Sequence, residues 1–468
     1  MKKTRDKLVK ITGKVIADAQ AVQAELELLQ EKPTGPGRTL QRRLGLWSAS
    51  LAGIGGILGA GIYALLGPAA GQAGSAIWLS FLVAALIAGL TGYSYARFVA
   101  IVPKNSPEFQ YASVAFGPTV GFAAGWVMVW SDLIAIAAVS IGFAGYLAHL
   151  LPVPVAIGAL LLVALLSLIA YLGIGESVGL VILFTLVEVG GLLFIIAVGL
   201  PYWGDVDYLE MPRGLGGVWT AAALVFFAYL GFDEFGNLAE ETREPERTLP
   251  RALFISMVVS TLIYIAVAFS AVSVVGWQDL SSSSAPLAQV AGSVLGPRAD
   301  LILSLIALAA TANTVLLFMV AASRSLYGMA SAGALPGWLA RVGRRRTPWM
   351  AIGITSLIAM AITFIGSIER VAQMTNASVL LSFAVVNLAL FWWTARRNET
   401  WTPKRVLLGA LPPLAATATC LWLLVYTGTE AILLSVGLGA LGLLIGLRLR
   451  KPQGGPGQGP GGRRGKRN

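Results

Sequence analysis

The sequence predicts an all-α membrane protein in which two inverted repeats of five transmembrane helices are followed by two further helices. Of the 468 residues, 56% are hydrophobic and 12% are charged, whereas soluble proteins average about 25% charged residues. Apolar stretches of about 20 residues, the length that crosses a bilayer, recur along the whole chain. Two of these stretches are interrupted by glycine at their centres, and five spans separate their starts.

The apolar stretches predict twelve transmembrane spans with both chain termini in the cytoplasm. The net charge is +11, yet only Arg213, Arg298 and Arg370 of the 34 Lys and Arg residues fall on the outer side. This is the positive-inside distribution of a membrane protein, so the basic excess does not indicate nucleic acid. The expected spans are 46–72, 75–101, 115–148, 153–173, 177–200, 216–240, 249–276, 297–328, 347–366, 369–394, 405–427 and 429–448.

Five regions follow from these spans. Because five is odd, the second repeat enters the membrane from the opposite side and is inverted. The outer loop 277–296 is expected to form a partly helical lid. The regions are a cytoplasmic amphipathic segment (1–45), a first repeat (46–200), a second repeat (201–394), two last spans (395–450) and a disordered basic tail (451–468).

The first span is broken at Gly59-Ala60-Gly61, within five glycines in nine residues. A break at membrane depth is tolerated only where it is buried in protein or lines a cavity. The free N–H groups at the start of the following half-helix favour a carboxylate or another anion. The alternative is helix packing through small residues, since Gly55 and Gly59 also fit a Gly-x-x-x-Gly pattern.

The second break lies in the sixth span, where Phe226, Phe227 and Ala228 precede Leu230-Gly231 and Asp233 follows. Unwound carbonyl groups at such a break can accept hydrogen bonds from an ammonium group, and a phenylalanine can cover the ligand. The alternative is that these aromatic residues pack in the core or face lipid. Two breaks in corresponding positions of two halves indicate a transporter binding site.

Carboxyl groups inside a membrane are costly and therefore mark function. Glu188 lies in the middle of the fifth span, on a face shared with small and polar residues, and is expected to carry a proton or bind a cation. Asp132, with Met128 at i−4, favours a cationic substrate if it faces the cavity. Thr311 and Thr314 share one face of the eighth span and are candidate ion ligands, while Asn313 points elsewhere. Structural hydrogen bonding is the alternative for each of them.

The chain has one cysteine, Cys420, and one histidine, His149. These counts exclude an intrachain disulfide and metal sites built from several cysteines or histidines. No span contains a paired constellation typical of an enzyme. We therefore expect neither catalysis nor a cofactor, and the driving ion is expected to be H⁺ or Na⁺.

Three motifs resemble the amino acid–polyamine–organocation (APC) superfamily of secondary transporters: the glycine segment 55–63, the stretch 226–250, and Ser323-Arg324-Ser325-Leu326-Tyr327-Gly328-Met329-Ala330. The resemblance covers about residues 40–450. It implies a LeuT-type fold, in which spans one, two, six and seven rock against a scaffold. It also implies that the amides of residues 59–61 bind a substrate carboxylate, and that carbonyls at Ile57 and 226–228 bind its ammonium group.

In this resemblance Phe227 falls at the outer aromatic gate. Glu188 falls where some proton-coupled members have a lysine, next to carbonyls that correspond to Gly55 and Leu58. The carboxyl inverts the charge at that position, and Ser331-Ala332 replaces an Arg-Asp pair.

The sequence thus predicts a plasma-membrane transporter of amino acids or related amines that works by alternating access, coupled to protons. The alternatives are sodium-coupled or exchange transport of cationic amino acids or polyamines, and an amino acid sensor that does not transport.

Overall fold

The computed structural model describes residues 44–99, 101–102, 107–173, 178–236, 242–331, 333, 335–343, 345, 347–397 and 406–449. Within these ranges the only β-type pairing is an isolated bridge between Leu44 and Thr242. The predicted amphipathic helix of the N-terminal segment and the predicted disordered tail lie outside the described residues.

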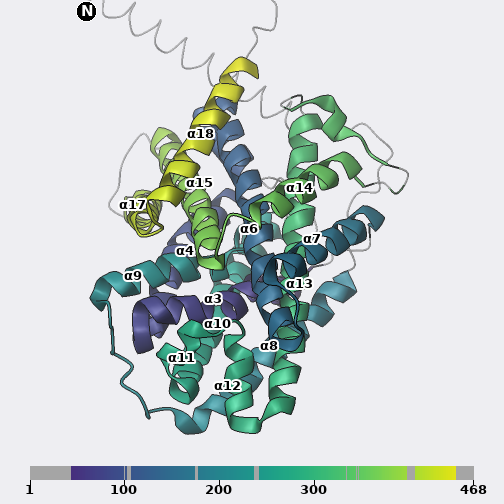
Figure 1. Cartoon of the computed structure of the whole chain (residues 1–468). Coiled ribbons are helices and arrows are strands. Elements are labelled where there is room, and N and C mark those ends of the chain that lie inside the picture. The colour runs from purple at the N-terminus through teal and green to yellow at the C-terminus, as the bar shows by residue number, and fades with distance from the viewer. Residues whose placement is uncertain are drawn as a thin grey trace, which may run out of the picture. The chain divides into compact units, whose positions relative to one another are not determined.

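The first half of the described chain contains a broken helix followed by four long ones (Figure 1). In order, its helices are α2 (Leu46–Ile57), α3 (Ala60–Ala73), η1 (Gly74–Ala76), α4 (Ile77–Val99), α5 (Pro107–Phe116), α6 (Pro118–Leu150), α7 (Val155–Leu172), α8 (Val178–Gly199) and η3 (Leu200–Tyr202).

The second half begins with a second broken helix. Its helices are α9 (Gly214–Val225), η4 (Phe226–Tyr229), η5 (Asp233–Gly236), α10 (Pro245–Val275), α11 (Trp277–Ser282), α12 (Pro286–Leu295), α13 (Pro297–Ser331), η6 (Gly337–Ala340), α14 (Trp349–Ile362), α15 (Ile368–Arg397), η7 (Val406–Ala410), α17 (Leu411–Val425) and α18 (Thr429–Leu449).

Proline and glycine set many of these boundaries. Pro118, Pro286 and Pro297 open α6, α12 and α13, because a proline at the first helical position loses no hydrogen bond and has a helical φ. Gly173 ends α7 in the left-handed conformation (φ 75°), which glycine adopts without strain. Gly276 ends α10 with φ 80°.

The predicted all-α multipass architecture is confirmed. Each of the twelve expected spans corresponds to a helix or a pair of helices. The described residues contain eight stretches that are long and apolar enough to cross a membrane, one of which, Ala60–Val99, includes both α3 and α4. The remaining spans correspond to shorter apolar helices, namely Leu46–Ile57, Gly214–Tyr229, Trp349–Ile362 and Leu411–Val425.

Helix α5 was not expected from the sequence. It lies between the second and third spans and buries Pro107, Glu108, Tyr111 and Ala112. The Tyr95 hydroxyl of α4 donates a 2.7 Å hydrogen bond to the Glu108 carboxyl. Its moderate apolar content and short length make α5 hard to distinguish from a loop by sequence alone.

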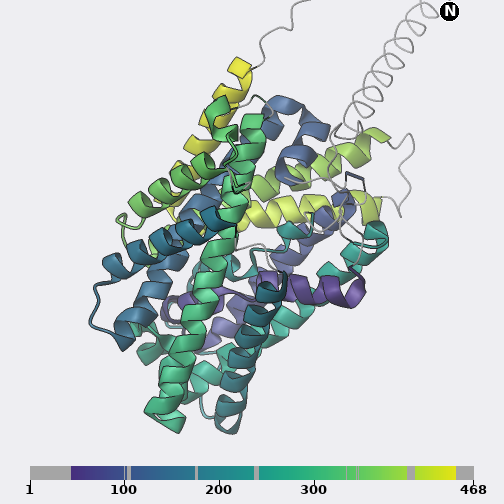
Figure 2. The ribbon, with the colours of Figure 1, turned by 90° about the vertical axis from the view of Figure 1, so that its right-hand side faces the viewer.

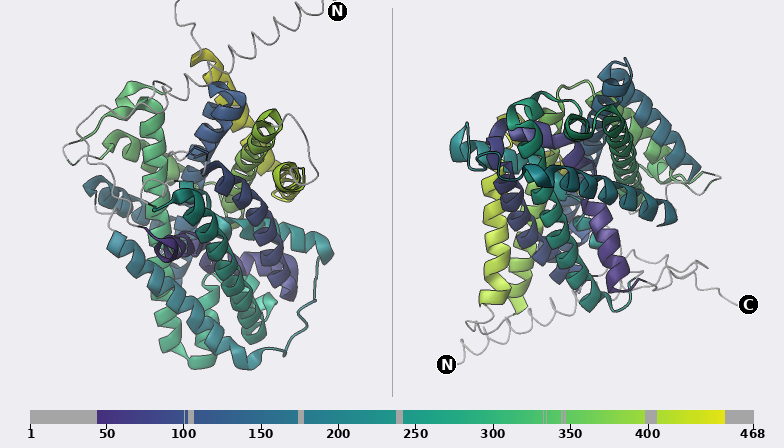
Figure 3. Two further views of the ribbon diagram at one scale, coloured as in Figure 1. Left: turned by 180° about the vertical axis from the view of Figure 1, so that it is seen from behind. Right: turned by 90° about the horizontal axis from the view of Figure 1, so that it is seen from below.

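The helices form two groups. In one, α10 packs against α2 and α4, and α9 packs against α3 and α4. In the other, α6 packs against α13 and α15, and α13 is the long green helix in Figure 2. The C-terminal helices α17 and α18 both contact α15 and appear in yellow-green in Figure 3. The two broken helices therefore belong to one group and face the other.

The loop between the seventh and eighth spans, expected to be partly helical, contains two short helices. They are α11 and α12, and α11 packs against α3, where Gly67 lies beside the Leu280 carbonyl group. Nearby, His149 at the end of α6 forms a 2.9 Å pair with Asp300 at the start of α13.

Candidate functional site

The first break consists of two residues between α2 and α3. Leu58 (φ −73°, ψ 100°) and Gly59 (φ −146°, ψ −153°) are extended, and the helix resumes at Ala60. An extended φ is open to any residue, so the need for glycine comes from a close approach. A Cβ at Gly59 would lie 2.8 Å from the Thr314 hydroxyl oxygen of α13.

Thr314 accepts a hydrogen bond from one of the amides that were expected to bind a substrate carboxylate. Its hydroxyl accepts a 3.1 Å hydrogen bond from the Ala60 N–H and donates one to the Ala310 carbonyl. The structure thus places Thr314 at the first break itself. Thr311, one turn earlier, donates to the Ala307 carbonyl of its own helix at 2.7 Å.

The second break is longer and more distorted. The helix tightens into η4, Leu230 is extended (φ −60°, ψ 145°), and Gly231 has φ 110°. Such a positive φ strains any residue with a Cβ. The Gly231 N–H donates a 2.9 Å hydrogen bond to the Asp233 carboxyl, which therefore stabilises the turn. This contact gives Asp233, predicted to bind substrate, a structural role at the break.

Asn376 of α15 holds the end of α9 where it unwinds. Its side-chain amide donates to the carbonyl groups of Ala223 and Leu224, at 2.7 and 3.0 Å. Both acceptors lie in the last turn of α9, where carbonyl groups lose the regular α-helical pattern of partners as the chain leaves the α-helix. An amide within an apolar span was a signal available from the sequence.

The two breaks touch each other directly. A Cβ at Gly61 would lie 2.7 Å from Ala228 Cβ and 3.0 Å from Ala228 N, and the Gly231 backbone lies against the Gly56 carbonyl. Only glycine at positions 61 and 231 allows the two broken helices to approach this closely. The structure therefore brings together the two segments that the sequence singled out.

The hydroxyl of Tyr264 on α10 lies between the breaks. Its oxygen is 2.6 Å from the Ile57 carbonyl oxygen and 2.8 Å from that of Ala228. Both carbonyls were expected to receive a substrate ammonium group. Tyr264 is fully buried. It was not predicted from the sequence, because a tyrosine in an apolar span usually indicates a packing residue. Its two hydrogen-bond partners are also 207 and 36 residues away along the chain.

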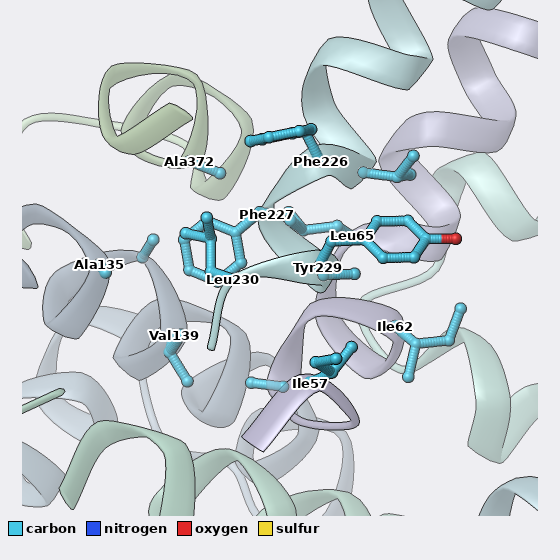
Figure 4. Close-up of a cluster of buried hydrophobic side chains, with 14 of the residues drawn as sticks. Ile57, Ile62, Leu65, Ala135, Val139, Phe226, Phe227, Tyr229, Leu230 and Ala372 are labelled. Carbon is cyan, nitrogen blue, oxygen red and sulfur yellow. The ribbon is translucent and has the colours of Figure 1, made fainter. Parts of the chain in front are cut away.

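Apolar side chains surround the breaks (Figure 4). Phe227 and Leu230 point toward Ala135 and Val139 of α6, while Tyr229 points to the opposite side, where its hydroxyl donates to the Phe81 carbonyl. Phe227 is 4% exposed, and its ring lies 6.2 Å from that of Phe318 on α13. Phe226 is fully buried, and its ring lies 6.3 Å from that of Phe383 on α15.

The remaining predicted substrate residues lie on α6. Asp132 is partly exposed and is three residues before Ala135, so the two share a helix face. Met128 is partly buried against the core one turn earlier. Met128 and Asp132 are thus displaced along α6 from the residues that Figure 4 shows beside the breaks.

Helix α8 passes along the first break. Before the break, Gly55 packs directly against the Thr185 side chain. After it, the Tyr63 hydroxyl donates a 3.0 Å hydrogen bond to the backbone carbonyl of Glu188. Glu188 lies one turn after Thr185 on this helix, so its backbone lies beside the first break.

The Glu188 carboxyl is 1% exposed, and neither of its oxygens has a hydrogen-bond partner among the described residues. The Asn313 side chain of α13 lies near the carboxyl, but it makes no hydrogen bond of normal geometry to either carboxyl oxygen. Asn313 was expected on a different face of this helix from Thr311 and Thr314, and it is this other face that lies near Glu188. Buried unpaired carboxylates are rare because an ionised group needs partners.

This arrangement offers backbone groups of both polarities within an apolar enclosure. Amides at the start of α3 attract anions, and carbonyls at Ile57 and Ala228 accept donors. No group of three or more potential metal-ligating side chains occurs among the described residues.

Known proteins with similar sequences are transporters. The amino acid permease family matches residues 44–437. A branched-chain amino acid permease of Bacillus subtilis is 28% identical over 88% of this chain and 93% of its own length. An uncharacterized transporter of Mycobacterium tuberculosis is 32% identical, covering 74% and 79%. Cationic amino acid transporter 1 of Arabidopsis thaliana is 27% identical, covering 77% and 64%. The chain belongs to the amino acid permease family, within the APC superfamily.

Proposed function

We propose that this permease carries neutral amino acids with branched apolar side chains across the plasma membrane by alternating access, in symport with protons. The observation that carries the proposal is the direct contact between the two unwound segments. That contact brings the start of α3 close to the carbonyls of Ile57 and Ala228, which supports a site with donors for an anion beside acceptors for a cation. A zwitterion of α-amino acid size matches this pair of polarities.

The apolar side chains around the breaks support a neutral substrate side chain. Among the buried side chains in Figure 4, Phe227 and Leu230 of the second break lie next to Ala135 and Val139 of α6. Asp233, the acidic residue that directly follows Gly231-Phe232 at the second break, is engaged with a backbone amide. The branched-chain substrate named for the Bacillus subtilis relative agrees with such apolar surroundings.

Glu188 supports proton coupling. An ionised carboxyl at the centre of a membrane costs about 2.5–3.5 kcal/mol on insertion scales, and Glu188 has no hydrogen-bond partner among the described residues to offset that cost. A carboxyl in this position is stable when protonated and becomes costly when it releases its proton. Because α8 contacts residues on both sides of the first break, we expect the protonation state of Glu188 to be linked to the position of α2 and α3.

A sodium site is less well supported. Thr311 and Thr314, the expected hydroxyl ligands, both donate their protons to carbonyl groups of α13. The Thr314 oxygen also accepts the Ala60 amide, which leaves little capacity for a cation.

Uptake into proteoliposomes tests the proposal. Purified protein is reconstituted, and the accumulation of radiolabelled leucine, arginine and putrescine is measured under an imposed pH gradient or an imposed sodium gradient. Leucine accumulation that follows the pH gradient is expected. Binding of leucine without uptake or exchange would contradict transport, and preferential accumulation of arginine or putrescine would contradict the neutral substrate.

A Glu188→Gln variant tests coupling separately. The amide keeps the size of the side chain but cannot titrate, so gradient-driven accumulation is expected to be lost while leucine exchange between equal concentrations continues. Glu430→Gln, which removes an exposed carboxyl paired with Arg370, is the control and is expected to behave like the native protein. Accumulation that survives Glu188→Gln with its pH dependence would make Glu188 structural.

A further inference from the structure

We propose that the Tyr264 hydroxyl substitutes for the substrate ammonium group between the two breaks when the permease returns without substrate. The inference rests on the proposed transport function and adds a consequence to it. Net uptake requires the empty protein to reorient, whereas exchange does not. Tyr264 is therefore expected to be a positioning residue for net uptake and dispensable for exchange.

The geometry that leads to this inference is the position of one hydroxyl between two segments far apart in sequence. The hydroxyl oxygen is within 2.6 Å of the Ile57 oxygen, at the end of α2, and 2.8 Å of the Ala228 oxygen, in η4. Tyr264 itself belongs to a third element, α10. Among the described residues, the Tyr264 hydroxyl is the one side-chain group that donates to both carbonyl oxygens, so it is their common donor.

The count of donors explains why an ammonium group would displace the hydroxyl. A tyrosine hydroxyl has one proton to share between the two carbonyl oxygens, whereas an ammonium group has three. A bound amino acid thus satisfies both carbonyls at once and has one donor left. The hydroxyl satisfies only one of them fully, so replacement of the hydroxyl by the substrate ammonium group is favourable.

The same count explains why the empty permease needs the hydroxyl. Ile57 and Ala228 are 1% and 2% exposed, so bulk water does not reach their carbonyl groups to donate hydrogen bonds. Leaving one buried acceptor without a donor slows a step that passes through this arrangement by about tenfold to hundredfold. During exchange the substrate supplies the donors in both directions, and this penalty does not arise.

Ring packing fixes the hydroxyl in place independently of any substrate. The Tyr264 ring lies edge-on to the Tyr229 ring, with centroids 5.4 Å apart, and tilted against Phe81 at 5.4 Å. Removing the hydroxyl leaves these contacts intact. A Tyr264→Phe variant is therefore expected to fold and to differ from the native protein in the donor alone.

The experiment compares two transport modes in the same proteoliposomes. Net uptake of radiolabelled leucine is measured in vesicles without internal leucine, and exchange is measured in vesicles preloaded with unlabelled leucine. For Tyr264→Phe, net uptake is expected to fall at least tenfold while exchange stays within about twofold of the native rate. Tyr229→Phe removes a buried hydroxyl bonded to a carbonyl of α4 instead, and is expected to affect both modes equally.

Restoring a donor at the same place provides the rescue. Incorporation of 4-aminophenylalanine at position 264 supplies N–H donors where the hydroxyl was, and net uptake is expected to recover. Equal losses of net uptake and exchange in Tyr264→Phe, including loss through misfolding, would overturn the inference, and so would unchanged net uptake. If the native protein itself shows neither mode with any amino acid, the proposed function fails, and that outcome is distinct because it does not involve Tyr264.

Discussion

A methyl group at position 61 tests whether the two breaks must touch. In a Gly61→Ala variant the new Cβ would lie 2.7 Å from Ala228 Cβ and 3.0 Å from Ala228 N. Carbon atoms in contact are normally about 3.5–4.0 Å apart. The obstacle includes the backbone of η4, so relief requires a shift of the whole segment and not a rotation of one side chain.

The cost follows from this overlap. Inserting a methyl group into a closely packed region costs about 1–3 kcal/mol, which corresponds to a change of about 5- to 150-fold in the population of the arrangement. Gly61→Ala is therefore expected to reduce the initial rate of leucine uptake by about that factor. The protein is expected to remain folded, because the overlap is confined to one contact.

Two glycines provide controls in the same assay. A Cβ at Gly56 would meet only the Gly231 carbonyl oxygen, at an ordinary 3.6 Å, and a Cβ at Gly190 would meet nothing within 4 Å. Gly56→Ala and Gly190→Ala are expected to stay within about twofold of the native rate, since alanine also favours the helix by about 0.5–1 kcal/mol. Uptake by Gly61→Ala within twofold of native would refute the idea that the breaks close on each other.

Two further substitutions test single hydrogen bonds at the breaks. Thr314→Val leaves a buried amide of α3 without its acceptor and is expected to lower the free energy of unfolding by about 1–3 kcal/mol. The melting temperature in detergent should therefore be lower than that of Thr311→Val, because the Thr311 hydroxyl bonds only within its own helix. Equal melting temperatures of the two variants would argue against the contact. Asp233→Ala removes the acceptor of the Gly231 amide, so its melting temperature is expected to be lower than that of Asp233→Asn, which retains an acceptor oxygen. A lower melting temperature for Asp233→Asn would contradict a structural role.

The two breaks were predictable because they depend on local composition. Glycine clusters and a helix interrupted at membrane depth have few explanations, and the structure unwinds the chain at Leu58-Gly59 and between Phe226 and Gly231. The burial of Glu188 was predictable as well, because a carboxyl in the middle of an apolar span is costly to expose to lipid, and Glu188 is 1% exposed.

The contacts between distant helices were not predictable from one sequence. Tyr264, Thr314 and Asn376 each bond to backbone atoms of another span, and backbone atoms carry no sequence signal. The same reason explains Asp233: its residue type suggested a charge for the substrate, whereas the positive φ of Gly231 creates a local amide that needs an acceptor. The predicted N-terminal amphipathic helix falls on residues outside those that the structure describes.

The two hydrogen bonds from Asn376 set a threshold for movement between the two helix groups. Asn376 is on α15, which packs with α6, whereas its acceptors end α9, which packs with α3 and α4. Any separation of α9 from α15 must break both bonds at once. At about 0.5–1.5 kcal/mol net for each bond, the closed arrangement gains about 5- to 150-fold in population. One side chain thereby ties the unwinding end of α9 to α15 through two hydrogen bonds that are lost together.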